Sequence, residues 1–550
     1  MPRLPDRPSL DHLKKQAKDL LALYRSGEPE ALTRLRDNLP AARGKDDEAI
    51  AALGLRLHDA QSCIAREYGF KSWAELSGFV AARNAAAADP GKAIRNLVGL
   101  IYAGDIAGGG DNAKPRVAAR FIEEWPELIN GDPYLACAVG DTAALRRETE
   151  RDPSWVNRPG GPLALPPLVA VAHSSLLKLP QYRDRLHDAA RLLLDAGADP
   201  DQSTPSRWMS TLEKQDDEHP LSALYGAAGQ NHDPELTQLL LSRGANPNDG
   251  ESLYHSLDRP AVTRLLLEAG ARIEGTIIYR ALDLADPEPV HVLLEHGGDP
   301  NERAPGPPTS DWGSPLMWAI RRRRSPAHVE ALLAAGADAE ARTPEGRSAY
   351  ETALQFGLPE IAALLATHGA GTCDLSIEDQ FVAACARGDA ETAGRIRERH
   401  PAMIQALSPA QLRMLPELAA QGAGDAVRLM VRLGWPIAVA GGDWKATALN
   451  HAVFRGDGAL TRFLLAHGAS WHEMHGFGDN VLGTLSWASR NGPTPGGDWV
   501  ACAEALVAHG IPPRHPDPKG SNCVILGGAC MPFSDDVTEV LLAAPAPVGT

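Results

Sequence analysis

The chain has 550 residues, which is too long for a single hydrophobic core unless the chain grows by stacking repeats. Hydrophobic residues make up 44% and charged residues 23%, which excludes a mainly disordered protein and a mainly membrane-embedded one. Lys and Arg number 54 against 70 Asp and Glu, and the net charge of −16 makes nucleic acid an unfavourable main partner.

The cysteines and the start of the chain bear on where the protein works. The seven cysteines form no CxxC pair, and an odd number in so long a chain indicates reduced thiols and a cytoplasmic location. The first residues contain no apolar stretch typical of a secretory signal. The sequence contains no run of about 18 uncharged apolar residues, which a membrane-spanning helix would need, so we expect no membrane association.

Residues 1–83 are expected to form a small helical domain. Apolar residues at helical spacing predict a first helix from Leu10 to Tyr24, and residues 57–80 predict two more helices around Gly69. Residues 84–93 are interpreted as a linker to the rest of the chain.

From residue 94 onward, one phrase recurs. A leucine-rich run is followed, after two variable residues, by Gly-Ala or a relative, as in EALLAAGADAE at 330–340. If the long interval between Gly369 and Gly434 counts as two repeats, the mean period is about 35 residues. The glycines of this phrase are Gly197, Gly244, Gly270, Gly297, Gly336, Gly369, Gly434, Gly468 and Gly510.

A second phrase precedes each leucine-rich run, as in SPLMWAI at 314–320 and TALNHAV at 447–453. Its opening polar or Pro residue suits a helix N-terminus, and its small residues allow a second helix to pack closely. The glycine after the leucine run suits a left-handed residue that ends the second helix. Each unit is therefore predicted to be helix, turn, helix and loop.

Together these phrases resemble the ankyrin repeat. The resemblance implies an all-α fold, an ankyrin-type α-solenoid of about thirteen helix-turn-helix units with short irregular or hairpin loops. We expect a first array at 94–370 and a second, continuous with it, at 377–550, with residues 523–545 as the exit cap. In residues 1–83, LKKQAKDLL and AQSCIAREYGFKSWAEL resemble an N-terminal helical segment of many bacterial ankyrin-repeat proteins.

The candidate partner-binding residues are arginines and loop tryptophans. The run Arg321–Arg324 follows SPLMWAI, where the resemblance implies a concave recognition surface, and arginines there could bind carboxylates bidentately. A solvated turn between helices is the competing interpretation of this run. Tryptophans in predicted loops are anchor candidates. The candidates are Trp312, Arg321, Arg322, Trp208, Trp444 and Trp471.

The function expected from these features is a non-enzymatic scaffold that binds an unknown protein partner as a monomer, with no cofactor, no catalytic residue and no metal. The alternative is an enzyme or a ligand or metal sensor. Its site would lie in the N-terminal domain or in the histidine loop at 467–475. His472 and His475 have only two residues between them, which does not fit the HExxH helix of zinc proteases, so a solvated loop is the favoured interpretation.

Overall fold

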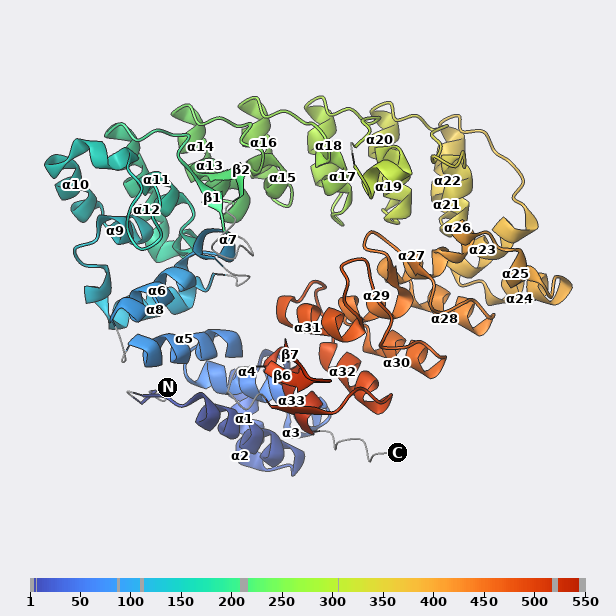
Figure 1. Ribbon diagram of the computed structural model, residues 1–550, viewed down its shortest axis with the longest axis horizontal. Helices are drawn as coiled ribbons and strands as arrows, with labels where there is room; N and C mark the ends of the chain where they lie inside the picture. The colour runs from blue at the N-terminus through green and yellow to red at the C-terminus, as the bar shows by residue number, and fades with distance from the viewer. Residues whose placement is uncertain are drawn as a thin grey trace. The chain divides into compact units, whose positions relative to one another are not determined.

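The computed structural model describes residues 4, 5, 7–86, 90–108, 113–207, 216–304, 306–516 and 523–543. The chain divides into two compact units, Met1–Arg272 (unit 1) and Ile273–Thr550 (unit 2). Both units consist mainly of helices that pack in pairs (Figure 1). The division falls inside the predicted first array, and residues 370–376 connect two helix pairs of unit 2.

Unit 1 begins with the predicted helical segment. The side chains of Leu13, Ala17 and Leu20 are buried, as their spacing indicates. Residues 84–86 and 90–93 of the predicted linker are helical, and residues 87–89 lie outside the described part. The helices are α1 (Leu10–Arg25), α2 (Pro29–Asn38), η1 (Pro40–Ala42), α3 (Asp47–Ala51), α4 (Leu57–Glu67) and α5 (Trp73–Ala86).

The rest of unit 1 is a series of helix pairs. A π-helical turn, η5, continues α13 directly. The elements are α6 (Pro90–Ile101), α7 (Gly104–Ala107), α8 (Pro115–Glu124), η2 (Pro126–Ile129), α9 (Pro133–Val139), α10 (Thr142–Arg151), η3 (Pro153–Asn157), α11 (Pro167–Ala172), η4 (Ser175–Lys178), α12 (Pro180–Asp195), β1 (Ser203–Ser206), β2 (Asp216–Ser222), α13 (Ala223–Tyr225), η5 (Gly226–Gln230), α14 (Pro234–Ser242), α15 (Ser252–Ser256) and α16 (Pro260–Glu268).

Unit 2 continues the pairing. The long interval between Gly369 and Gly434 contains two pairs, α23–α24 and α27–α28, as predicted. The elements are α17 (Ile277–Leu282), α18 (Glu288–Glu295), η6 (Thr309–Trp312), α19 (Pro315–Arg321), α20 (Pro326–Ala334), α21 (Ala349–Gln355), α22 (Pro359–Thr367), α23 (Ile377–Arg387), α24 (Ala390–Arg399), α25 (Met403–Ala406), α26 (Pro409–Leu412), α27 (Met414–Ala420), α28 (Gly424–Arg432), β3 (Ala440–Gly441), β4 (Ala446–Thr447), α29 (Ala448–Arg455), α30 (Gly458–Ala466), α31 (Val481–Asn491), α32 (Trp499–Ala508), β5 (Arg514–Pro516), β6 (Cys523–Leu526), β7 (Ala529–Pro532) and α33 (Asp535–Ala543).

The ends of these helices follow the sequence chemistry. The side chains of Ser314 and Thr447 accept hydrogen bonds from backbone amides three residues on, at Met317 and Asn450, and so cap α19 and α29. All nine glycines of the leucine-rich phrase have φ between +85° and +97°. The prediction that these glycines are left-handed is therefore confirmed.

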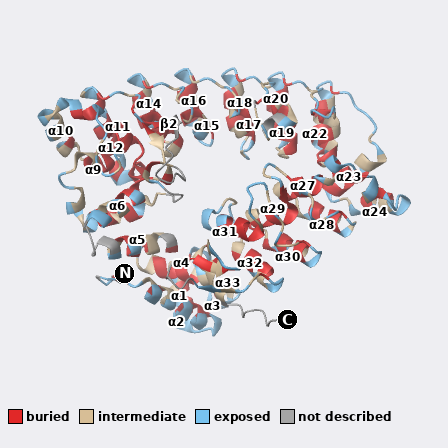
Figure 2. Cartoon of the chain, in the orientation of Figure 1, coloured by how far each residue is buried: buried red, intermediate tan, exposed pale blue. Residues whose placement is uncertain are grey.

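Packing between neighbouring pairs forms the core of each unit. The leucines of the second helices, such as Leu266 in unit 1 and Leu332 in unit 2, are fully buried. Figure 2 shows buried residues along the facing sides of the paired helices, with exposed residues at their outer sides and in the loops. A single pair would leave these apolar sides in water, so stacking supplies the stability.

The structure departs from the all-α expectation in three small antiparallel sheets, β1–β2, β3–β4 and β5–β6–β7. The predicted exit cap at 523–545 is a β-hairpin followed by α33. The hairpin has a physical cause: β-branched and apolar residues in CVIL and ACMP flank a Gly527–Gly528 turn, and both glycines have positive φ.

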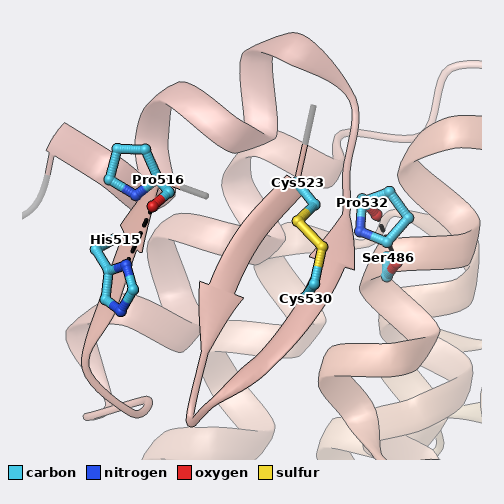
Figure 3. Close-up of a disulfide and its surroundings, with 6 residues drawn as sticks. All are labelled: Ser486, His515, Pro516, Cys523, Cys530 and Pro532. Atoms are coloured by element: carbon cyan, nitrogen blue, oxygen red, sulfur yellow. Dashed lines mark hydrogen bonds between the residues drawn. A yellow bond between two sulfur atoms is a disulfide. The ribbon is translucent and has the colours of Figure 1, made fainter. Parts of the chain in front are cut away.

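The hairpin also carries a disulfide between Cys523 and Cys530 (Figure 3). The prediction of reduced thiols is wrong for this pair, because strand pairing brings the two cysteines together with Cα atoms 5.7 Å apart. The five other cysteines are free thiols. The cytoplasmic location, which rested on reduced cysteines, stays a prediction. No described helix is long and apolar enough to cross a membrane.

Candidate functional site

The predicted arginine run lies at the end of α19 and in the turn after it. All four side chains bind groups of unit 2 itself. Arg323 donates to the carbonyl of Phe356, and Arg324 donates to the carbonyl of Leu284. The run is therefore neither a solvated turn nor a set of unoccupied guanidinium groups.

Arg321 and Arg322 form what we call the arginine clamp, together with Asp283, Glu417 and Asp443. Arg321 donates from Nε and Nη2 to the two carboxylate oxygens of Glu417, at 3.1 and 3.3 Å. Its Nη1 lies 2.6 Å from Oδ1 of Asp443. Arg322 bridges two carboxylates, with Nε 2.7 Å from Asp283 and Nη2 2.7 Å from Asp443.

The clamp joins parts of unit 2 that are far apart in the sequence. Arg321 belongs to α19 and Glu417 to α27, and two helix pairs, α21–α22 and α23–α24, lie between them along the chain. Figure 1 shows α19 and α27 close to each other. The clamp therefore fixes how these helices approach across the face formed by the first helices of the pairs.

Tryptophans cover the two guanidinium groups. The guanidinium carbon of Arg321 lies 4.9 Å from the ring centre of Trp312 and 5.1 Å from that of Trp318. The carbon of Arg322 lies 4.2 Å from the ring centre of Trp318, whose indole N–H donates to Asp283. Each arginine thus combines an aromatic face with carboxylates.

The charges of the clamp stabilise one another. Burial opposes the charge on Arg321, but the carboxylates of Glu417 and Asp443 outweigh it and raise the pKa of Arg321. Burial likewise opposes ionisation of Asp443, and the two arginines outweigh it and lower the pKa of Asp443. Both groups are therefore charged at neutral pH.

These contacts change the interpretation of three candidate residues. Arg321 is only 2% exposed, and Trp312 is half-buried against Arg321 and Phe356. The carboxylates expected from a partner are supplied by the chain itself for Arg321 and Arg322. Replacing these residues would disturb the fold, so loss of binding in such variants would not identify a binding surface.

Trp444 has a different setting. It lies at the tip of the β3–β4 hairpin, next to Asp443, and starts a row of four aromatic rings. Phe477 stacks on Trp444 with ring centres 6.5 Å apart, and the ring centre of Phe454 lies 5.5 Å from that of Trp444. Phe454 stacks in turn on Trp487 at 5.6 Å, with the rings nearly parallel at 7°. We call these four residues the aromatic ridge.

The ridge is exposed at Phe477 and Trp487, while Trp444 and Phe454 are half-buried. Phe477 is 82% and Trp487 50% exposed, and Met474 in the same loop as Phe477 is 55% exposed. Among the described residues, the other exposed large hydrophobic side chain is Leu23, in unit 1. Because isolated exposed apolar residues are common but clusters are not, this grouping is a candidate binding surface.

The loop that carries Phe477 is held in place by hydrogen bonds. The backbone N–H of Gly476 donates to the carbonyl of Trp444 at 2.7 Å, and a Cβ at residue 476 would meet that oxygen at the same distance. Asn450 of α29 donates to the carbonyl of Glu473 and accepts from Thr484 of α31. The ridge is thus held in a fixed arrangement by two neighbouring helix pairs of unit 2.

Trp471 stacks on His472 with ring centres 3.5 Å apart and faces the C-terminal hairpin. It lines a cleft of about 580 Å³ with residues of α31 and of the β6–β7 hairpin, including Leu482 and Met531. Asp479 and Asn480 give the cleft a polar side. Trp208, the remaining candidate, lies outside the described residues.

The histidine loop at 467–475 shows no metal-binding arrangement. His467 bonds to the carbonyl of Phe463, and His475 lies 5.0 Å from the ring of Trp444. Across the described ranges, no group of three or more His, Cys, Asp or Glu side chains is placed to hold a metal ion.

Phe454, Phe477 and Trp487 were not predicted from the sequence. Their positions give no consistent sequence signal: Phe454 and Trp487 are each the seventh residue of the first helix in their pair, but the same position holds Val139 in α9 and Ala420 in α27.

The comparisons with known proteins add little to this picture. No protein-family model matches the chain, and no curated protein matches it. The solved human ASB11 ankyrin repeat domain is similar over 44% of this chain and 98% of that domain, with 18% identity and a TM-score of 0.32. The repeat architecture therefore rests on the helix pairs and the glycine geometry described above.

Proposed function

We propose that the protein is a non-enzymatic scaffold of ankyrin-type repeats that binds a protein partner through the aromatic ridge. The observation that carries the proposal is the series of ring contacts that joins exposed Phe477 to exposed Trp487 through Trp444 and Phe454, with exposed Met474 in the same loop as Phe477. Aromatic side chains and Met are enriched at the centres of protein interfaces, where they bury large areas at a small cost in conformational entropy.

The geometry of the ridge supports a protein partner over other ligands. The rings project from two hairpin or loop tips and two helices, α29 and α31, and so present a surface rather than an enclosed cavity. A small ligand would be buried by a pocket. Nucleic acid bases could stack on such rings, but the net charge of −16 opposes phosphate binding.

Affinity capture from the native cell tests the proposal. The wild-type chain, the double variant Phe477→Ser/Trp487→Ser and the control Leu23→Ser are compared by quantitative mass spectrometry. Leu23→Ser is the matched control, because it removes the exposed apolar side chain of unit 1. All three proteins should melt at similar temperatures, since the exposed side chains contribute little to the core.

We expect a specific partner to be retained by the wild type and the control, and to be reduced at least tenfold by the double variant. Equal recovery with all three proteins would contradict the ridge as the binding surface.

A further inference from the structure

We propose that the aromatic ridge binds a basic segment of its protein partner, with arginine side chains lying on the exposed rings. This inference rests on the proposed function and adds the chemistry of the partner. Three observations lead to it: the way unit 2 binds its own arginines, the rings left uncovered on the ridge, and the charge of unit 2.

The first observation is the arginine clamp itself. In unit 2, Arg321 and Arg322 lie over the faces of Trp312 and Trp318 at 4.2 to 5.1 Å, with carboxylates at the edge of each guanidinium. A cation over an aromatic face is attracted by the negative charge of the ring face, most strongly for Trp and for Arg. Tryptophan with an adjacent carboxylate is thus an arginine-binding arrangement that this unit already uses.

The second observation is that exposed rings of the ridge lie near a carboxylate that the clamp does not use. Phe477 lies two residues before the exposed Asp479, whereas Asp443, next to Trp444, is already paired with Arg321 and Arg322. Among the described residues, no arginine or lysine lies over the ring of Trp444, Phe454, Phe477 or Trp487. The ring faces that are exposed therefore remain available to a partner's cations.

The third observation is charge. Residues 273–550 hold 32 acidic and 21 basic residues, a formal charge of −11 for unit 2. Such a field attracts a basic segment and repels an acidic one over distances comparable to the Debye length. It therefore increases the rate at which a basic partner meets the ridge.

The groups bordering the ridge are compatible with a bound cation. Burial lowers the pKa of His475, and Asp479 only partly offsets this effect, so the imidazole next to Trp444 and Phe477 is neutral at pH 7. Lys445 is the basic neighbour of Trp444 in the hairpin, and it is exposed. A flexible exposed lysine can turn away from an incoming guanidinium.

The test uses the purified full-length chain and fluorescent twelve-residue peptides that differ in one property. One peptide carries four arginines in a Gly/Ser background. In the second, citrulline replaces each arginine and keeps its shape without the charge. In the third, glutamate replaces each arginine. Binding is measured by fluorescence anisotropy at two salt concentrations.

We expect the arginine peptide to bind at least tenfold more tightly than the citrulline peptide, and the glutamate peptide not to bind. The double variant Phe477→Leu/Trp487→Leu keeps apolar surface but removes two ring faces, and it should weaken arginine-peptide binding about tenfold. Leu23→Ala should leave that binding unchanged. Binding should also weaken as the salt concentration rises.

Equal binding of the citrulline and arginine peptides would overturn the inference, because the ridge would then act as an apolar surface alone. Undiminished arginine-peptide binding by the double leucine variant would also overturn it, because the peptide would then be held by general negative charge. If the ridge variants still lose the captured partner in either case, the proposed function stands and only the chemistry of the partner is wrong.

Discussion

Gly336 shows how a single residue can determine where the second helix of a repeat ends. It ends α20 with φ of +94°, and a Cβ built there would meet no neighbouring atom within 4 Å. Any loss on substitution must therefore come from the backbone conformation, which a branched side chain disfavours. We expect Gly336→Val to lower the free energy of unfolding by about 1–3 kcal/mol, measured by urea denaturation.

Gly394 provides the matched control for this prediction. It lies inside α24, its φ is not positive, and a Cβ there would also meet no atom within 4 Å. Gly394→Ala should raise the stability by about 0.5–1 kcal/mol, because alanine favours the helix. If both substitutions change the free energy of unfolding in the same direction, backbone conformation does not determine the effect of substitution at these two glycines.

The burial of His451 leads us to expect a loss of stability in mild acid. Burial lowers the pKa of this histidine to about 4, from an ordinary value near 6.5, although its Nε2 lies 3.2 Å from the carbonyl of Gly441. The folded chain therefore binds this proton less readily than the unfolded chain. The stability present above pH 6.5 should fall as the pH drops from 6.5 to 4, by up to about 3 kcal/mol.

Urea denaturation at a series of pH values checks this slope. Asp443 makes a separate contribution: because its pKa is lowered, its stabilisation is lost only as the pH falls below about 3.8. Burial also lowers the pKa of His173 and His328, so the variant His451→Gln should reduce the loss of stability between pH 6.5 and 4 without abolishing it, and should leave the loss below pH 4 in place. An unchanged slope in the variant would assign the acid sensitivity to other groups.

At the scale of elements, neutralising one carboxylate of the arginine clamp should lower the stability of the fold measurably. Glu417→Gln leaves a nearly buried guanidinium with one carboxylate fewer, and removing one partner of a buried ion pair costs about 3–5 kcal/mol. We expect a loss near the lower end of that range, because Asp443 still faces Arg321.

A double-mutant cycle isolates the pair. Replacing both partners, as Arg321→Met/Glu417→Leu, should cost less than the two single changes added together, since no buried charge is left unpaired. Asp425→Asn, which breaks an exposed pair with Arg428, is the control and should have a far smaller effect. Additive losses in the cycle would show that Arg321 and Glu417 do not act as a pair.

The C-terminal hairpin provides a second prediction at this scale. The Cys523–Cys530 disulfide joins β6 and β7, and the side chain of Ser486 in α31 donates to the carbonyl of Pro532 (Figure 3). Cys530→Ser should increase backbone hydrogen exchange in residues 523–532 and leave α29 and α30 protected, because the disulfide restrains the hairpin locally. Cys373→Ser, at an exposed free thiol, is the control.

Thiol counting decides whether the disulfide forms. The protein denatured without reductant should show five of its seven thiols free to alkylation. Seven free thiols, or unchanged exchange in Cys530→Ser, would contradict this account of the hairpin.

The sequence predicts helices far better than it predicts contacts between them. The leucine runs and the left-handed glycines are local signals, so the helix pairs and their ends followed from the phrases. The hairpin at 523–532 was missed, although its Gly-Gly turn between apolar strands is also a local signal. The stretch was predicted only as the exit cap of the array, without strands.

The candidate site shows what could not be predicted from the sequence, namely contacts between distant helices. Sequence reasoning selected Trp444 and the arginine run, and the structure places Trp444 on the exposed ridge but buries Arg321. The burial depends on Glu417, which lies 96 residues further along the chain. No local pattern predicts such a contact, because it is set by how far successive pairs rotate before α27 meets α19.

At the scale of the whole molecule, stacking explains why a chain with few aromatic residues can still present an aromatic surface. Each pair buries its leucines against its neighbours, so the side chains at loop tips and at the ends of first helices are not needed for that leucine packing. The residue types at these positions can therefore vary to suit binding without loss of the leucine packing. Unit 2 uses this freedom twice, once to hold its own arginines and once, in our account, to hold those of a partner.

Site-specific photo-crosslinking in the native cell tests this central claim most directly. A photoreactive amino acid replaces Phe477 in one variant and Leu23 in the other, and crosslinked peptides are mapped by mass spectrometry. We predict that residue 477, and not residue 23, crosslinks to one protein within a segment rich in arginine. No crosslink from residue 477 beyond that from residue 23 would contradict the claim that the ridge is the binding surface.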